Sequence, residues 1–202
     1  TNILTLDLES VRQRLLRSAW VRDVELKRVL PGTLTLEIVE RTPVAIAVLD
    51  ELYLLAEDGT VLDQLSPQYD VSSLVLVQGL REGKRLSYER ALLAGRLAEA
   101  LTADGRLALL VSEIDVSEGT RSITLHLRKP AVTFLVEERT MVARLKELLP
   151  LVDSVLDRFP NLSVVDLRFR DRIYLRLIEP NPGETYAKRY TSTDFAIGGA
   201  SS

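Results

Sequence analysis

Residues 20–43 contain the runs Val24-Glu25-Leu26-Lys27-Arg28 and Leu30-Pro31-Gly32-Thr33-Leu34-Thr35-Leu36-Glu37-Ile38, and this stretch decides the fold of the first part of the chain. Apolar and polar residues alternate in both runs, which is typical of strands that bury one face. The Pro-Gly pair between the runs predicts a tight turn. Pro43 marks the end of the second strand, because proline cannot donate to a ladder of backbone hydrogen bonds.

A helix is expected just before this hairpin. Asp7 is a good N-cap for a helix over about residues 8–17, because its carboxylate can accept from backbone N–H groups of the first turn. Leu8, Val11 and Leu15 share one face of that helix at helical spacing. A helix packed on a hairpin is too small to be stable without further elements.

The region after Pro43 is rich in predicted strands. Asp58-Gly59 predicts a hairpin turn, since glycine accepts a positive φ. Pro150 should bend or end the helix in which it lies. The expected strands cover about 44–48, 53–55, 61–62, 74–77, 109–116, 121–128, 165–170 and 172–177, and the expected helices cover about 87–101 and 138–157.

These patterns predict an α+β fold in three parts. Residues 1–43 form a helix packed on a β-hairpin, and residues 44–178 form an extended, mostly antiparallel β-sheet domain with two helices. Residues 179–202 are rich in Pro, Gly, Ser and Thr and poor in aliphatic side chains, which predicts a flexible C-terminal tail.

Composition restricts the classes of function. The 202 residues are 46% hydrophobic and 27% charged, which suits a folded domain with a buried core. The net charge of −3 and the aromatic content of 5% argue against a nucleic-acid partner. The absence of cysteine excludes disulfides, thiolate catalysis and Cys-ligated metals. No apolar run reaches the about 18–20 residues that span a bilayer, and the missing initial methionine is expected of a fragment.

No catalytic constellation stands out, so we predict no catalytic residue, no metal and no cofactor. His126 is the only histidine and lies on the polar face of its predicted strand, where a surface role is expected. Carboxylates are frequent on strand faces and turns, and no spacing singles out a pair. Those considered are Glu37, Glu40, Asp58, Asp115 and Asp166.

The last predicted strand, 172–177, is the best candidate for a binding site. If it lies at the edge of the sheet, its free N–H and C=O groups can accept a partner strand. Arg172, Tyr174 and Arg176 would flank the added strand, and Tyr and Arg are frequent at binding hot spots. The same charges also suit an edge that is merely protected from aggregation, and the sequence favours neither interpretation.

Six segments, taken in order, resemble the FtsQ/DivIB family of bacterial cell-division proteins. They resemble motifs of that family's POTRA domain, of its domain junction and of its β domain. The segments are Asn2-Ile3-Leu4 with Asp7-Leu8, Trp20-Val21, Arg28-Val29-Leu30-Pro31, Glu40-Arg41-Thr42-Pro43-Val44-Ala45, Leu54–Leu62, and Val165-Asp166-Leu167-Arg168-Phe169.

The resemblance implies a non-enzymatic scaffold of the divisome, anchored in the inner membrane by a single span, with the present fragment on the periplasmic side. It implies a partial POTRA domain over 1–43, lacking the first strand and helix, and an FtsQ-type β domain over 44–178. It implies that the β domain binds FtsB and FtsL by strand addition, that the POTRA region contacts other divisome proteins, and that the membrane is reached only through the absent anchor. The implied partner-binding residues are Phe169, Arg172, Ile173, Tyr174, Leu175, Arg176 and Leu177.

Two other functions stay open at this point. A POTRA-bearing module can handle outer-membrane proteins, although such proteins usually carry several POTRA repeats or a β-barrel. A carboxylate-dependent hydrolase of envelope glycans would need two carboxyl groups facing one cleft at roughly 5–10 Å.

Overall fold

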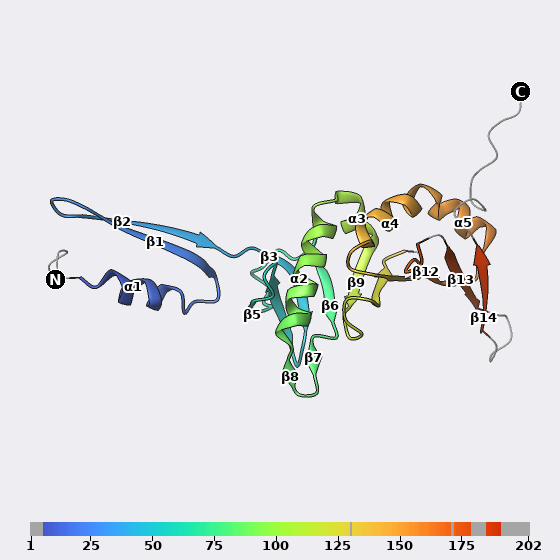
Figure 1. Ribbon diagram of the computed structural model, residues 1–202, viewed down its shortest axis with the longest axis horizontal. Helices are drawn as coiled ribbons and strands as arrows, with labels where there is room; N and C mark the ends of the chain where they lie inside the picture. Colours follow the sequence, from blue (N-terminus) through green and yellow to red (C-terminus); the bar gives the residue numbers. More distant parts are fainter. Residues whose placement is uncertain (1–5, 130, 171, 179–184, 191–202) are drawn as a thin grey trace, which may run out of the picture.

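The computed structural model describes the chain except for residues 1–5, 130, 171, 179–184 and 191–202. Its first part is helix α1 (Leu8–Leu15) followed by the antiparallel strands β1 (Val21–Val29) and β2 (Thr33–Glu40), which form a two-stranded sheet. Asp7 caps α1, because its Oδ1 accepts from the backbone N–H of Glu9 at 3.0 Å. Figure 1 shows this part as a narrow arm that extends away from the rest of the molecule. The predicted helix and hairpin are thus confirmed.

The arm buries little apolar surface. Val24 of β1 is buried, but Ile38, its cross-strand partner on β2, is 42% exposed. Leu36, two residues before Ile38 on the same face of β2, is also exposed. The helix therefore covers only part of the hairpin face, as expected for a unit with so few elements.

The larger part of the chain is built on one ten-stranded sheet with the order β14-β13-β12-β11-β10-β9-β6-β3-β4-β5. Its pairings are antiparallel except for β3 with β6, β6 with β9 and β11 with β12. The predicted mostly antiparallel sheet is confirmed. The strands are β3 (Pro43–Val48), β4 (Leu52–Ala56), β5 (Val61–Gln64), β6 (Val75–Gln78), β9 (Val111–Asp115), β10 (Ile123–Leu127), β11 (Thr133–Val136), β12 (Leu162–Asp166), β13 (Ile173–Ile178) and β14 (Thr185–Tyr190), and a separate small hairpin consists of β7 (Arg81–Glu82) and β8 (Arg85–Leu86).

Helices and one face of the sheet enclose the main core. The helices are α2 (Tyr88–Thr102), α3 (Gly105–Leu110), α4 (Met141–Leu148), the short 3-10 turn η2 (Leu149–Leu151) and α5 (Val152–Arg158). The predicted helix over 138–157 is interrupted at Pro150, as expected of proline. Helix α3 was not predicted, and it replaces the first residues of the strand expected at 109–116. Asp104 stabilises α3 by accepting from the N–H groups of Arg106 and Leu107, at 3.2 and 3.4 Å.

A second, smaller core lies on the opposite face of β4 and β5. Leu54, Ala56 and Leu62 are buried there, and Trp20 and Tyr69 pack against them. Trp20 comes from the end of the arm, just before β1. The arm is therefore attached to the large sheet by an aromatic contact as well as by the continuous chain.

The C-terminal edge of the sheet differs from the prediction. Residues 172–177 were expected to form the edge strand, but β13 lies between β12 and β14. Residues 185–190 were expected to belong to a flexible tail, but they form β14, antiparallel to β13. The rest of that predicted tail lies outside the described residues. The segment that forms β14 contains Thr and two Tyr, which favour strands, and β13 offers it a complete row of backbone groups.

No helix within the described ranges is long and apolar enough to cross a membrane.

Candidate interaction site

The seven predicted partner-binding residues separate into two groups at the C-terminal end of the sheet. Ile173, Leu175 and Leu177 are buried on the face of β13 that α4 and α5 cover, and Leu175 is only 1% exposed. These three side chains contribute to the core and do not form a surface. Arg172 is exposed and precedes β13.

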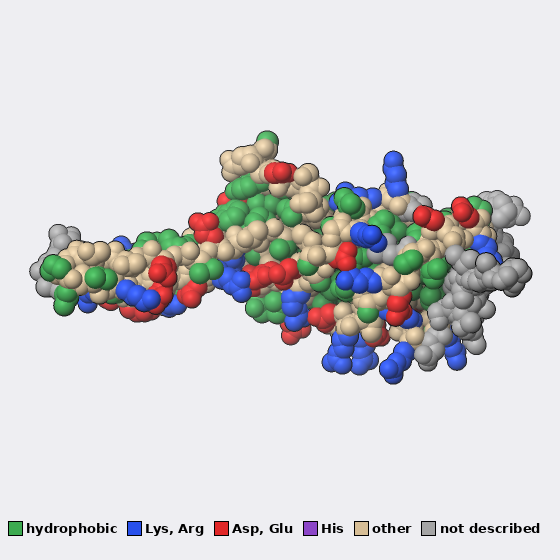
Figure 2. Space-filling model, turned by 90° about the horizontal axis from the view of Figure 1, so that it is seen from above, with side chains coloured by type: hydrophobic (Ala, Val, Ile, Leu, Met, Phe, Trp, Pro, Cys, Tyr) green, Lys and Arg blue, Asp and Glu red, His purple; other side chains and the backbone are tan. Residues whose placement is uncertain are grey.

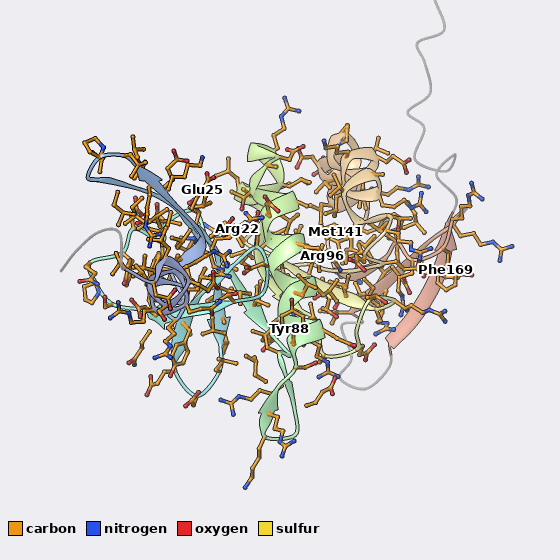
Figure 3. The ribbon with its side chains drawn as sticks, turned by 60° about the vertical axis from the view of Figure 1, so that its left-hand side comes forward. Arg22, Glu25, Tyr88, Arg96, Met141 and Phe169 are labelled. Atoms are coloured by element: carbon orange, nitrogen blue, oxygen red, sulfur yellow. The ribbon has the colours of Figure 1, made fainter. Side chains whose placement is uncertain are left out.

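The second group lies on the opposite, open face of the same strands. Phe169, Tyr174 and Arg176 line a shallow hollow of about 180 Å³, which we call the Tyr174 hollow. The rings of Phe169 and Tyr174 meet edge to face, with their centroids 4.9 Å apart. Phe169 is 45% exposed, and Figure 3 shows it at the C-terminal end of the molecule, far from Arg22 and Tyr88. The remaining lining residues are Leu135, Val164, Asp166 and Leu175.

A charge-assisted network holds the segment that carries Phe169. Arg168 donates from Nε and Nη2 to the two carboxylate oxygens of Asp166 at 2.9 and 2.7 Å. The same guanidinium donates from Nη1 to Ser122 Oγ at 3.0 Å. The hydrogen bonds with Asp166 raise the pKa of Arg168 further above its ordinary value. Two parallel bonds of this kind fix geometry well, so the chain after β12 is fixed in place beside the hollow.

Helix α4 supports the same segment from the other side. Arg144 donates from Nη2 to the backbone carbonyl of Phe169. The backbone N–H of Leu167 donates to the carbonyl of Leu135 on β11 at 2.8 Å. Phe169 therefore presents its ring from a backbone that is held at several points, and a rigid aromatic side chain is a good anchor for a partner because it loses little conformational entropy on binding.

Sequence reasoning found four residues of the hollow (Phe169, Tyr174, Leu175 and Arg176) and missed the other three. Leu135 and Val164 lie at positions of β11 and β12 that alternate with buried ones, which is a visible signal. The sequence did not show that β11, β12 and β13 are neighbours, so it could not place these residues beside Tyr174. Asp166 was considered only as a solvated carboxylate, whereas it pairs with Arg168.

Carboxylates do gather elsewhere, at the junction between the arm and the sheet. A hollow of about 260 Å³ there is lined by residues that include Glu57, Asp58 and Glu99. Figure 2 shows side chains of both charges side by side where the arm meets the body. Arg41 donates to Asp58 at 2.7 Å, and Arg22 pairs with Glu57.

The contacts of these carboxylates do not favour a glycosidase. Such enzymes need two carboxyl groups that are available to the substrate, whereas here the nearby Glu57 raises the pKa of Glu99. Glu57 and Asp58 are also paired with arginines. Within the described ranges, no group of three or more His, Asp or Glu residues is placed to hold a metal ion.

Arg41 connects the two parts of the chain at this junction. Besides its bond to Asp58, its Nη1 donates to the carbonyl oxygens of Ala19 and Val21 at 2.9 and 2.6 Å. Trp20, which lies between those two residues, donates from its indole N–H to Asp63 Oδ2 at 2.9 Å. One arginine and one tryptophan thus bind the arm to the turn and the edge of the sheet.

Comparisons with known proteins agree with one another. Residues 1–41 match the family model of the FtsQ-type POTRA domain. The chain is 30% identical to the cell division protein FtsQ of Syntrophotalea carbinolica over 185 residues, which are 88% of this chain and 64% of that protein. It is 42% identical to FtsQ of Myxococcus fulvus over 83 residues, or 41% of this chain and 29% of that protein. It is 29% identical to FtsQ of Rhizobium radiobacter over 188 residues, or 89% of this chain and 80% of that protein. The chain thus spans less than two thirds of the first two relatives.

Proposed function

Because the chain belongs to the FtsQ family of cell-division proteins, we propose that it is the extracytoplasmic part of a non-enzymatic scaffold of the divisome. The relatives described above are all named as cell-division proteins, which favours this role over the handling of outer-membrane proteins. The junction carboxylates, which are paired with arginines, give no support to a glycan hydrolase. In the whole protein, a single inner-membrane span would anchor this part.

The proposed division of labour follows the two sheets. Residues 1–43 act as the POTRA region and contact other divisome proteins, and residues 44–178, together with β14 of the same sheet, act as the β domain. FtsB, in complex with FtsL, binds at the C-terminal end of the ten-stranded sheet by adding a strand there. The observation that supports this site is the Tyr174 hollow, where an aromatic pair on a well-held backbone lies next to the sheet's C-terminal edge.

The added strand and the hollow have separate roles in this proposal. Main-chain pairing supplies the alignment, since backbone groups recognise any extended chain. The hollow supplies selectivity, since Phe169 and Tyr174 can bury one apolar side chain of the partner, and Arg176 can pair with a carboxylate. Ile173, Leu175 and Leu177 hold β13 against the main core.

Binding of the FtsB–FtsL extracytoplasmic complex from the same genome tests the proposal. Phe169→Ala and Tyr174→Ala are expected to weaken the affinity at least tenfold each, about 1.4 kcal/mol or more, because they remove the two anchors. Tyr88→Ala is the matched control, since Tyr88 is 68% exposed and lies far from the hollow. Wild-type affinity in both hollow variants, with circular dichroism showing that they are folded, would contradict the site.

A further inference from the structure

We propose that β14 is a built-in competitor, which occupies the edge of β13 until the strand of a partner displaces it. This inference rests on the proposed function, and it adds a mode of regulation to the same site. Its starting point is that the backbone edge assigned above to a partner is already taken within the chain.

The occupation of β13 by β14 is complete. All six residues of β13, Ile173–Ile178, have register partners on β14, from Ile173 opposite Tyr190 to Ile178 opposite Thr185. A partner strand that paired with β13 would use the same N–H and C=O groups. The two strands therefore exclude each other at this edge.

The central residue of β14, Lys188, is poorly matched to a permanent place in the sheet. The register aligns Tyr186, Lys188 and Tyr190 with Leu177, Leu175 and Ile173, so a charged residue takes the central place opposite Leu175, which is 1% exposed. Directly opposed residues of antiparallel strands share a face, so a permanent neighbour would be expected to carry an apolar residue at that position. Lysine interrupts the apolar alternation of β14 at this position, and lysine is a typical residue of edges that resist further pairing. A partner strand with apolar residues opposite Ile173, Leu175 and Leu177 would extend the core and compete favourably.

The edge of β13 would survive the departure of β14. The side chains of Ile173, Leu175 and Leu177 are anchored in the main core. Asn161 holds the end of β13 on the β12 side, because its Nδ2 donates to the carbonyl of Ile178 at 2.6 Å and its carbonyl accepts from the N–H of Ile178 at 2.8 Å. Strand β12 pairs with β13 from Leu162 to Asp166. A formed edge would therefore remain for the partner.

Competition from β14 should weaken the apparent affinity for the partner by a measurable factor. A strand tethered by a short connection competes at an effective concentration on the order of millimolar. If the open form is about 10% populated or less, the apparent dissociation constant is raised at least about tenfold. Removing the competitor should lower that constant by the same factor.

The first test uses the full chain and joins β13 to β14 by a disulfide that can be reduced again. Arg176 and Ala187 are register partners, and opposed positions of this kind suit a disulfide. The chain has no other cysteine, so Arg176→Cys with Ala187→Cys can form only this intramolecular bond. The oxidised variant is expected to bind the FtsB–FtsL complex at least tenfold more weakly than the same variant after reduction. Equal affinity of the two forms would overturn displacement, because the partner would then be binding beside an intact β14.

The second test weakens the pairing of β14 with β13, and it should raise the affinity for the partner instead of lowering it. Ala187→Pro with Lys188→Pro removes two successive donors, of which one must face β13 because successive N–H groups alternate in direction. This variant is expected to bind the complex at least tenfold more tightly than wild type. Ala187→Val with Lys188→Thr keeps both donors and favours a strand, and it should bind no better than wild type. Weaker binding by the proline variant would contradict the proposal.

Hydrogen exchange separates failure of this inference from failure of the proposed function. In the isolated chain, the amide protons of β13 that face β14 should exchange at least tenfold faster than those that face β12, and the oxidised cysteine variant should remove the difference. If no variant binds the complex, the proposed partner is wrong, and exchange alone decides whether β14 opens. Equal protection of both sets of amides would overturn the inference, whatever binds.

Discussion

Arg41 Nε lies 2.7 Å from Asp58 Oδ2, and this ion pair links the end of the arm to the turn between β4 and β5. Both side chains are mostly buried, at 18% and 31% exposure. Burial alone raises the pKa of Asp58, but hydrogen bonds from Arg41 and Thr60 outweigh it and lower the pKa below its ordinary value. The pair therefore stabilises the junction at neutral pH.

Arg41→Ala is expected to lower the free energy of unfolding by about 1–3 kcal/mol, because it leaves Asp58 and the carbonyls of Ala19 and Val21 without their donor. Urea denaturation at pH 7 measures this loss. The ionic part is fully present above the ordinary Asp pKa of 3.8 and is lost as the pH falls through the lowered pKa of Asp58. Arg85→Ala, at an exposed position of β8, is the control and should change stability by less than about 0.5 kcal/mol.

Tyr69→Leu should loosen the attachment of the arm. The ring of Tyr69 stacks on Trp20 with centroids 5.9 Å apart, and both side chains donate to Asp63. Trp20 is the only tryptophan, so its fluorescence reports on this contact alone. We expect a red-shifted emission maximum and a loss of roughly 1 kcal/mol in stability, with unchanged far-UV circular dichroism. An unshifted emission maximum would show that the stack does not shield Trp20; Tyr88→Leu is the control.

Gly59→Ala should be far more damaging than Gly83→Ala. Both glycines have positive φ, +78° and +62°, so each alanine incurs a backbone cost of about 1 kcal/mol. A Cβ at Gly59 would also lie 2.5 Å from the backbone N of Leu92 on α2, whereas nothing lies within 4 Å of one at Gly83. We expect a loss of at least about 3 kcal/mol for Gly59→Ala and about 1 kcal/mol for Gly83→Ala. Similar thermal midpoints for the two variants would contradict the close packing of α2 on this turn.

Glu99→Gln should stabilise the protein slightly at pH 7. The neighbouring Glu57 carboxylate raises the pKa of Glu99, so the ionised form is disfavoured in the folded state. A raised carboxyl pKa destabilises the fold above that pKa, and the penalty disappears as the pH falls and Glu99 is protonated. The higher urea midpoint of Glu99→Gln at pH 7 should therefore shrink on acidification and be absent below the ordinary value of 4.5. A gain that persists at pH 3.5 would point to a cause other than repulsion.

Local signals in the sequence predicted local structure well. Asp58-Gly59 indicated a turn because glycine accepts positive φ, and Gly59 has φ +78°. Pro150 indicated a break, and η2 lies there between α4 and α5. Regular alternation placed the interior strands because each buries one face. Helix α3 was missed because it has only six residues, and the adjoining apolar run could equally continue a strand.

What the sequence could not provide was the arrangement of distant segments. All five strands β1–β5 lie between Trp20 and Tyr69 in the chain, and no periodicity links the two residues. Strand β14 was missed because the composition of residues 179–202, rich in Pro, Gly, Ser and Thr, indicated a tail, and Lys188 interrupts the only apolar alternation there. The Tyr174 hollow was found only in part for the same reason, since its walls come from three strands whose order had to be observed.

From β9 to β14, each strand lies next to the one that precedes it in the chain. A polypeptide is synthesised from its N-terminus, so β13 can join the sheet before residues 185–190 have emerged. During that interval the outer side of β13 is bare. A partner that is present during synthesis can therefore pair with β13 before β14 forms. A partner that arrives later must displace β14, so the timing of synthesis affects assembly.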